Sequence, residues 1–478
     1  MAQKFAGRVL ILGAGSVVQC TLPLMLKHIA TPSQVTVMAK DDGSARIMNE
    51  IKQGVTFKID SITKDNLAEK LSAHLSAGDL LLDLSFNIET NAILQWCHDN
   101  DVLFLNASVE EWDPYEDWTN RPLVERTLYA RHMRMREMTG TWDKKGPSAV
   151  VDHGANPGLV SHFTKAALVD IANKLKQDSK SNDKIENALK QEKYNELAHL
   201  LGVKVIHIAE RDTQITNKPK QLNEFVSTWS VEGFYEEGIA PAEVGWGTHE
   251  KELPENGVKH TGNGPCNQIA IAQPGVKTWV RSWVPDSEYI GMVIRHGEAF
   301  TITEHLTVKD DSGKDIYRPT VNFAYCPSNE SIVSLMELEM RQWDLQENQR
   351  IMNDEIIDGE DRLGVLLMGH EYKAWWYGSL LSIHDSRKLV PGQNATTLQV
   401  ACSVVAASMW MIDNPNEGVL VPDQLPWRYV MDIAKDYLGE MRSVPVDWDP
   451  LKTRNDLYKG LNGRSYDSDP WQFNNFLV

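Results

Sequence analysis

Cysteine is scarce in this sequence, and none of the five cysteines has a second one nearby in the chain. They are widely spaced and odd in number: Cys20, Cys97, Cys266, Cys326 and Cys402. Zinc sites and redox dithiols place cysteines a few residues apart, so this spacing predicts neither. Inert thiols are typical of proteins in a reducing compartment. We therefore expect no metal site and a cytoplasmic location.

Long apolar runs and an excess of basic residues are also missing. The N-terminal run Val9–Leu12 is too short for the core of a secretion signal, and no unbroken run reaches the roughly 18 apolar residues of a membrane span. The 48 Lys and Arg against 66 Asp and Glu give a net charge of −18. An acidic surface repels nucleic-acid phosphates and attracts small cations. The sequence therefore predicts neither a membrane nor a nucleic-acid partner, and it favours a cationic small molecule.

The composition that is present is that of a globular protein. Of its residues, 42% are hydrophobic and 24% are charged. The length of 478 residues is enough for two or three domains. The first 150 residues alternate short apolar runs with helical patterns, and strands buried on both faces have such runs. The strands predicted here are 9–12, 34–38, 55–59, 80–83, 102–106 and 149–152. This alternation predicts an α/β domain, a Rossmann-type doubly wound parallel sheet.

The pattern changes after residue 155. From 203 to 327 aromatic residues alternate with polar ones, as in 277–284 and 317–325, which is typical of an antiparallel sheet with one packed face. Residues 394–411 form a long, mostly apolar helical run. We therefore predict a Rossmann domain over 1–155 and an α+β domain built on a largely antiparallel sheet over 156–393. A C-terminal helix and tail over 394–478 would pack back on the first domain.

A dinucleotide site is predicted at the first turn between strand and helix. Gly13 permits the tight turn, and Gly15 lets the backbone approach a pyrophosphate. Ser16 and Val17 then open the helix, whose N-terminus attracts phosphate. Val18 stands where a third glycine is usual, so a glycine-rich turn without a ligand is the alternative.

The other strand ends bear on the cofactor's identity and on the rest of its site. The acid that binds the adenosine ribose usually ends the second strand. Ala39 stands there, followed by Lys40, which would attract a 2′-phosphate, and by Asp41, which could reach the ribose. We favour NAD over NADP. In open sheets ligands bind where the carboxyl ends of the strands converge. The further cofactor-binding candidates at those ends are Leu84, Ser85, Asn106, Ala107, Asn156 and Pro157.

Longer strings carry a family resemblance. Besides Gly13-Ala14-Gly15, they are 152–158 (DHGANPG), 206–214 (IHIAERDTQ), 228–234 (TWSVEGF), 241–248 (PAEVGWGT), 317–320 (YRPT), 376–379 (WYGS) and 469–473 (DPWQF). Together they resemble the bacterial homospermidine synthases of the saccharopine-dehydrogenase-like group over nearly the whole chain. The resemblance implies a redox-neutral reaction in which NAD takes a hydride from putrescine, ammonia leaves, a second putrescine attacks the imine, and the returned hydride gives sym-homospermidine. It also implies a homodimer.

The resemblance also assigns roles to individual residues. Trp229 steers the amine by a cation–π contact. Glu210 and Asn156 form the inner amine pocket, and His296 is the proton-transfer group. On the residues alone, a core tryptophan, a structural histidine and surface acids would explain such positions better. The further substrate-binding positions are Glu237, Glu298, Glu110 and Asn87.

Two other functions stay open. A reductive dehydrogenase of the same group, such as carboxynorspermidine or saccharopine dehydrogenase, takes a substrate with a carboxylate and needs an arginine clamp, for which Arg211, Arg281 and Arg295 are present. A non-catalytic NAD-binding protein would keep the fold without turnover. The sequence identifies neither the general base nor whether spermidine also serves as a donor.

Overall fold

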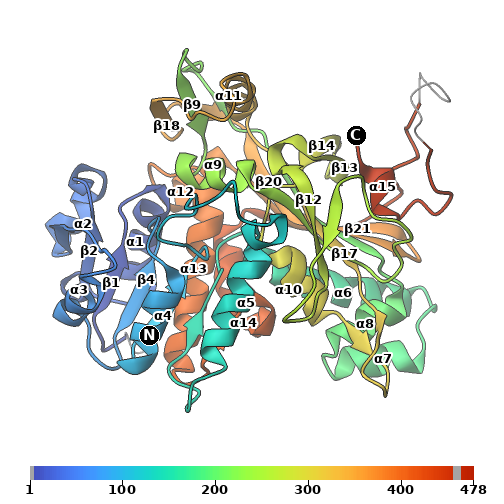
Figure 1. Ribbon diagram of the computed structural model, residues 1–478, viewed down its shortest axis with the longest axis horizontal. Coiled ribbons are helices and arrows are strands. Elements are labelled where there is room, and N and C mark those ends of the chain that lie inside the picture. Colours follow the sequence, from blue (N-terminus) through green and yellow to red (C-terminus); the bar gives the residue numbers. More distant parts are fainter. Residues whose placement is uncertain (1–4, 456–464) are drawn as a thin grey trace.

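The computed structural model describes residues 5–455 and 465–478, and its core is two β-sheets that lie side by side (Figure 1). The first sheet has seven strands in the order β22-β6-β5-β4-β1-β2-β3. All its neighbours pair in parallel. The strands are β1 (Val9–Leu12), β2 (Val35–Ala39), β3 (Thr56–Ile59), β4 (Leu80–Asp83), β5 (Leu103–Asn106), β6 (Ala149–Val150) and β22 (Val419–Leu420). Without β22, this is the strand order of the doubly wound dinucleotide fold, so the predicted Rossmann-type sheet is confirmed.

The central strands of this sheet are buried on both faces because helices cover each face. In β1, Val9 and Ile11 belong to one apolar cluster and Leu10 and Leu12 to another, since successive side chains of a strand point to opposite faces. The helices of this part of the chain are α1 (Ser16–His28), α2 (Met48–Gln53), α3 (Leu67–His74), α4 (Thr90–Asp99) and α5 (Leu128–Thr139). The continuous apolar runs of β1, β4 and β5 are thus explained by burial on two sides, whereas β3 at the edge of the sheet is largely exposed.

Residues 395–420 of the C-terminal segment complete this first domain, whereas residues 440–446 and 473–476 pack with the second. Helix α13 (Ala395–Asp413) lies against α1, and β22 extends the sheet by pairing with β6. Among the described residues, α13 alone is long and apolar enough, by length and composition, to cross a membrane, with a mean hydropathy of 1.5 over its 18-residue window. That window is 78% buried inside the protein, which is the setting of a core helix. The mean hydropathy of the window is high although a few polar residues interrupt the apolar run.

The second sheet has ten strands and is mostly antiparallel. Its main path is β11-β12-β10-β17-β7-β20-β21-β23, and the pair β13 and β14 joins at β17. The strands are β7 (Val205–Asp212), β10 (Pro241–Gly245), β11 (Gly257–Lys259), β12 (Gln268–Pro274), β13 (Trp279–Val284), β14 (Ser287–Met292), β17 (Thr320–Cys326), β20 (Glu360–His370), β21 (Lys373–Ser382) and β23 (Glu440–Val446). The predicted largely antiparallel sheet is confirmed, with β17 and β7 as its parallel pair.

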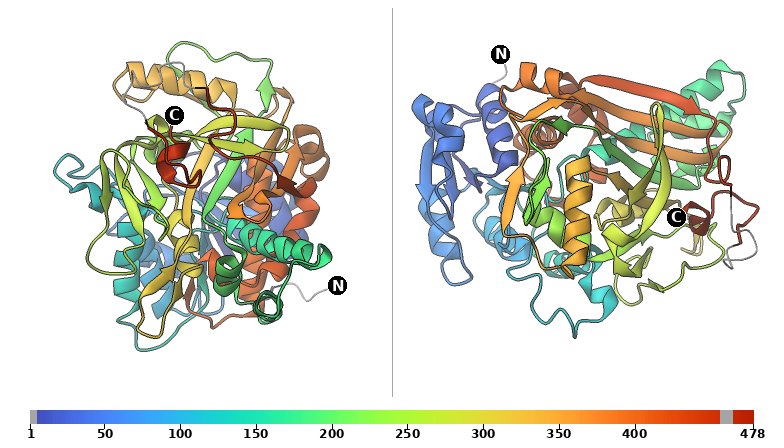
Figure 2. Two further views of the ribbon diagram at one scale, coloured as in Figure 1. Left: turned by 90° about the vertical axis from the view of Figure 1, so that its right-hand side faces the viewer. Right: turned by 90° about the horizontal axis from the view of Figure 1, so that it is seen from above.

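Strand β17 differs from the expectation of one packed face. All seven of its residues are buried, because helix α10 (Glu298–His305) lies against it and β13 and β14 also contact it. The remaining helices are α6 (Leu159–Gln177), α7 (Asp183–Lys190), α8 (Tyr194–Leu201), α9 (Val231–Ile239), α11 (Asn329–Met340), α12 (Ile383–Leu389), α14 (Trp427–Ala434) and α15 (Phe473–Phe476). The short remaining strands are β8 (Ile215–Thr216), β9 (Glu224–Ser227), β15 (Val308–Lys309), β16 (Asp315–Tyr317), β18 (Asn348–Ile351) and β19 (Ile356–Asp358). Figure 2 shows the C-terminus far from the first domain.

Asn394 fixes the start of α13 to the second domain. Its Oδ1 accepts the N–H of Thr397 at 2.8 Å, which caps the helix. Its Nδ2 donates to the carbonyls of Thr228 at 2.7 Å and Met352 at 2.8 Å. The side chain is fully buried, so these carbonyls have no water to replace it.

We expect Asn394→Ala to lower the free energy of unfolding by about 2–4 kcal/mol, because a helix cap is lost and two buried carbonyls lose their donor. Asn182→Ala is the matched control: Asn182 caps α7 in the same way but is exposed, and its loss should cost about 0.5–1 kcal/mol. Urea denaturation of the two variants measures the difference. Equal losses would contradict the role given to Asn394.

Candidate active site

Residues that follow several parallel strands line one cavity together with residues of the second sheet. Its empty volume is ≈ 1120 Å³, counted to include the open mouth. The predicted site residues that line it are Val17, Leu84, Ser85, Ala107, Glu110, Asn156, Pro157, Glu210, Trp229, Glu237 and His296. Since these residues come from both domains, the cavity requires the two to be assembled.

The glycine turn after β1 fits a phosphate group. Gly13 has φ +96°, and a Cβ there would lie 2.6 Å from the carbonyl oxygen of Leu84. A Cβ on Gly15 would meet nothing within 4 Å, so the backbone is open on that side. No side chain caps α1, which begins at Ser16, and no acid stands in its first turn. The N–H groups at this helix end are thus available to an anion.

The ribose-binding choice remains a prediction. Lys40 and Asp41 both lie exposed after β2, beside a turn in which a Cβ on Gly43 would come 2.7 Å from Ala14 Cβ. The end of β2 is therefore packed against the glycine turn, where an adenosine ribose would be held.

The loop after β6 is tightly folded under the cavity. Asp152 has φ +61°, and its N–H donates to Asn106 Oδ1 at 2.9 Å. Gly158 has φ +131°, and a Cβ there would lie 1.9 Å from the carbonyl oxygen of Gly154. Only glycine fits at that point, and the turn presents Asn156 to the cavity. Asn106 braces this loop from behind and does not itself line the cavity.

Glu210 lies at the inner wall of the cavity, two residues before the end of its strand. It lies on β7, is 4% exposed, and accepts a hydrogen bond from Asn156 Nδ2 at 2.6 Å. Burial raises its pKa to about 8, although the bond from Asn156 acts in the opposite direction. The carboxyl group is therefore protonated at neutral pH in the free protein.

His296 stands between two carboxyl groups. Its Nδ1 lies 3.0 Å from Glu298 Oε1, its Nε2 lies 3.0 Å from Glu237 Oε2, and its ring stacks on Phe323 at a centroid distance of 4.3 Å. Burial lowers the pKa of His296, but the two glutamates outweigh burial and hold it well above its usual value. Glu298 is behind the histidine and does not line the cavity, whereas Glu237 does. The three groups form a hydrogen-bonded chain that runs from the cavity wall into the interior.

Trp229 presents its indole to the cavity between β9 and α9. Its Nε1–H donates to the hydroxyl of Tyr325 at 3.1 Å, and its ring stacks on Phe234 at a centroid distance of 5.3 Å. A Cβ on Gly233 would come 3.2 Å from the indole, so glycine there leaves room for it. The ring is half-buried, held on one face and edge, and lines the cavity with the rest.

Glu110 lies on the side of the first domain. It is buried and accepts the hydroxyl of Ser108 at 2.6 Å. Burial raises its pKa to about 8, and Glu236 raises it further while Arg131 lowers it. Asn87 is exposed and does not line the cavity; its backbone N–H points to Glu110 Oε2 at 3.5 Å. The structure thus does not place this residue in the cavity wall, and its predicted contact with substrate stays a prediction.

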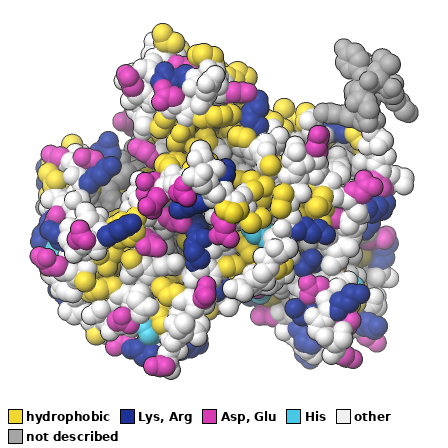
Figure 3. Space-filling model, viewed as in Figure 1, with side chains coloured by type: hydrophobic (Ala, Val, Ile, Leu, Met, Phe, Trp, Pro, Cys, Tyr) yellow, Lys and Arg dark blue, Asp and Glu magenta, His cyan; other side chains and the backbone are white. Residues whose placement is uncertain are grey.

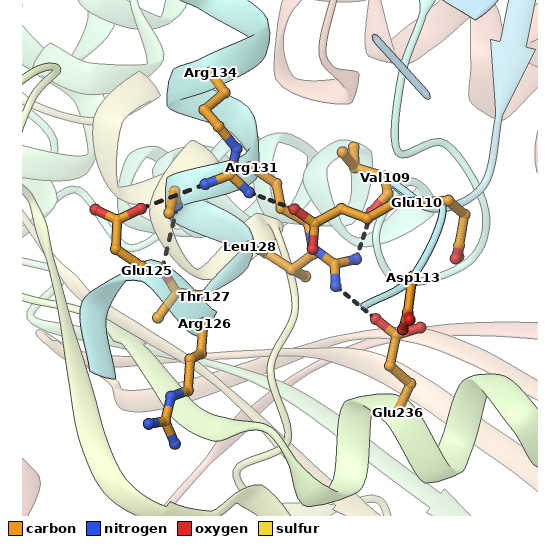
Figure 4. A network of polar contacts seen from close by, with 12 residues as sticks. Val109, Glu110, Asp113, Glu125, Arg126, Thr127, Leu128, Arg131, Arg134 and Glu236 are labelled. Atoms are coloured by element: carbon orange, nitrogen blue, oxygen red, sulfur yellow. Dashed lines mark hydrogen bonds and ion pairs between the residues drawn. The ribbon is translucent and has the colours of Figure 1, made fainter. Parts of the chain in front are cut away.

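Sequence reasoning missed an ion network in the cavity wall. Arg131 donates to the carbonyl of Val109 at 2.8 Å and to Glu236 Oε1 at 2.7 Å, and Figure 4 shows it reaching between those two residues. Arg295, named before only as a possible clamp, pairs with the same Glu236 oxygen. Arg131 and Glu236 are far apart in the sequence, and no motif surrounds either of them. The carboxyl groups of the wall are Asp83, Glu110, Asp152, Glu210, Glu236 and Glu237, against the guanidinium groups of Arg131 and Arg295.

Comparisons with known proteins identify the family of the chain. Residues 154–446 match the saccharopine dehydrogenase C-terminal domain, and residues 9–150 match the saccharopine dehydrogenase NADP binding domain. The homospermidine synthase of Mesorhizobium japonicum is 38% identical over 483 residues, covering 99% of this chain and 97% of that one. The homospermidine synthase of Blastochloris viridis is 40% identical over 489 residues, covering 99% and 98%. The solved structure of Legionella pneumophila homospermidine synthase in complex with NAD is 39% identical, with a TM-score of 0.86 over 100% of this chain and 98% of that one. The chain therefore belongs to the homospermidine synthase family.

Proposed function

We propose that the chain makes sym-homospermidine from two putrescine molecules, with release of one ammonia, and uses NAD without net oxidation. The observation that carries this is the cavity: carboxyl groups outnumber guanidinium groups in its wall, and an indole faces into it. A diamine brings the positive charges that such a wall lacks. The family assignment supplies the reaction.

The first-domain side of the cavity suits NAD. Gly13, Gly15 and the start of α1 would hold the pyrophosphate, and Val17, Leu84 and Ser85 would lie along the dinucleotide. When bound, NAD supplies the redox chemistry, as acceptor of a hydride from the carbon next to an amine and as its later donor to an imine.

The second-domain side binds and deprotonates the amine. Glu210 and Asn156 would hold the reacting nitrogen, with the carboxylate taking its proton, since an amine loses hydride from its neighbouring carbon only as the free base. The Trp229 face would position the ammonium end of the chain. His296, between Glu237 and Glu298, would pass protons between the cavity and the interior.

The cavity wall supports a substrate with a carboxylate less well than it supports a diamine. Two guanidinium groups do reach the wall, but both are paired to Glu236, so neither is a free clamp. Stoichiometry separates the functions: with putrescine and catalytic NAD, the proposed enzyme makes homospermidine and ammonia in equal amounts without accumulating NADH. Steady NADH formation, or a need for a 2-oxo acid, would favour a reductive dehydrogenase. A protein that binds NAD without turnover would form neither product.

We also propose that the chain forms a homodimer through α11. Along this helix Val333, Met336 and Met340 follow at helical spacing and are 51%, 64% and 71% exposed. Leu222, in the segment hydrogen-bonded to α11 through Asn223, is 87% exposed. Figure 3 shows hydrophobic side chains over the projecting part of the molecule where Figure 1 labels α11. An apolar stripe of this kind is typical of an interface.

Replacement of Trp229 tests the cation–π contact. We expect Trp229→Ala to lower kcat/KM for putrescine roughly 5- to 30-fold, since the contact contributes about 1–2 kcal/mol when desolvated. NAD binding should be unchanged, and Trp229→Phe should recover part of the activity because a ring remains. Trp142→Ala, which removes an indole stacked on His98 outside the cavity, is the control. Unchanged turnover in Trp229→Ala would remove the indole from the mechanism.

The raised pKa of Glu210 predicts a pH dependence. Because the free carboxyl group is protonated below about pH 8 and a bound ammonium favours the carboxylate, putrescine binding releases a proton. Its affinity for the NAD-loaded protein should rise from about pH 6 to about pH 8 and then level off. Glu210→Gln should flatten this rise and lower kcat/KM at least about 100-fold, with the NAD dissociation constant nearly unchanged.

Glu250→Gln is the matched control for this titration. Burial raises the pKa of Glu250 to about 7, but this carboxyl group lies outside the cavity, so its loss should leave the pH profile of putrescine binding as it is. Calorimetry in buffers of different ionisation enthalpy measures the proton release. A parallel loss of NAD and putrescine binding in Glu210→Gln would indicate damage to the fold instead.

The dimer is tested by placing charge on α11. We expect the unaltered chain to elute at twice its 54.0 kDa mass in light-scattering chromatography, and the double variant Met336→Glu, Met340→Glu to elute as a monomer. Ile59→Glu adds one such charge at an exposed apolar residue of β3, 60% exposed, and should stay dimeric. A dimer that persists in the double variant would place the interface elsewhere.

A further inference from the structure

The cavity wall holds two arginines that share one glutamate as an ion-pair partner. Arg131 on α5 and Arg295 after β14 are 5% and 1% exposed, and both line the cavity. Both place a guanidinium nitrogen on Oε1 of Glu236, a residue of α9. Arg131 has a further partner in Glu111, with 3.2 Å between Nε and Oε2. Glu236 is the one carboxylate that ion-pairs with Arg295 in the described part of the chain.

Arg295 still has unused capacity as a donor. One of its terminal nitrogens bonds the carbonyl of Arg126 at 3.1 Å, and another bonds Glu236. Its Nε is buried without a hydrogen-bond partner. A guanidinium group presents its donors in a fork that matches a carboxylate. Without Glu236, the two arginines would therefore offer a carboxylate-binding site in the cavity wall.

The neighbouring glutamate faces a different partner. Glu237 follows Glu236 on α9 and lies 3.0 Å from His296, because successive residues of a helix point about 100° apart. The pKa of Glu236 is lowered: burial raises it, but Arg295 and Arg131 outweigh burial. The two glutamates thus have different partners: Glu236 pairs with the arginines, and Glu237 contacts His296.

We propose that Glu236 determines substrate specificity: by ion-pairing with both Arg131 and Arg295 it keeps the cavity selective for diamines over amines that carry a carboxylate. The proposal rests on the proposed function, because it concerns which amines enter the same cavity. Because Glu236 and Arg295 carry opposite charges, removing one should change the preference for diamines in the opposite direction to removing the other. Removing Glu236 adds net positive charge to the wall, and removing Arg295 subtracts it.

The test compares putrescine with L-ornithine, which is the putrescine skeleton with one carboxylate added. Dissociation constants of both would be measured by calorimetry on the NAD-loaded protein. We expect Glu236→Gln to lower the preference for putrescine over ornithine at least tenfold, and Arg295→Gln to raise it at least threefold. Glu111→Gln is the matched control, since it removes a carboxylate from Arg131 outside the cavity, and it should stay within twofold of the unaltered protein.

A lowered preference for putrescine in Glu236→Gln together with a raised preference in Arg295→Gln would support the proposal. A merely structural role predicts that the preference falls in both variants. A folded Glu236→Gln with unchanged preference would overturn it, as would a shift in Glu111→Gln equal to that in Glu236→Gln. If Glu236→Gln does not fold, Arg295→Gln decides alone: a raised preference supports the proposal and an unchanged or lowered one overturns it. Failure of the unaltered protein to bind putrescine would instead contradict the proposed function, and this proposal with it.

Discussion

The active site depends on one imbalance: more carboxyl groups than permanent cations are buried around a single cavity. A carboxylate out of water is unfavourable unless a cation or several donors accompany it. In the free protein the response is retention of protons, seen in the raised pKa of Glu210 and Glu110. A bound diamine would stabilise the ionised carboxylates instead, because its two positive charges can be spaced along the wall. Affinity for a polycation and the presence of a proton acceptor are then two results of the same burial.

Such an arrangement must be held rigidly, and the two sheets do this from opposite sides. The strands of the first sheet deliver the loops around Ser85 and Asn156, and β7 of the second delivers Glu210. The two halves are linked by α13, whose capping residue Asn394 bonds the backbone of Thr228, next to Trp229. The side chain that we propose to steer the substrate is thus positioned by a helix end that belongs to the core.

Local patterns predicted the first domain well, and long-range contacts explain what they left out. Strands β1 and β4 were predicted to the residue because burial on both faces leaves an unbroken apolar run. Strand β22 has only two residues, too few for any pattern. The glycine turn was visible since its function is local. Trp229 and Glu210 were found only through the family's strings, and the link between Arg131 and Glu236 spans 105 positions with no periodic signal.

The pairing of β22 with β6 has a consequence for how the chain is made. The outer edge of the first sheet is completed by β22, which begins 270 positions after β6 does (149 to 419). One face of this domain is covered by α13, which begins 246 positions after β6 does (149 to 395). On the ribosome, the nucleotide-binding half must therefore wait with an open strand edge and uncovered apolar surface until nearly all of the chain has emerged. The two domains therefore do not fold independently, one after the other. Excising either one would leave the other without a wall it needs.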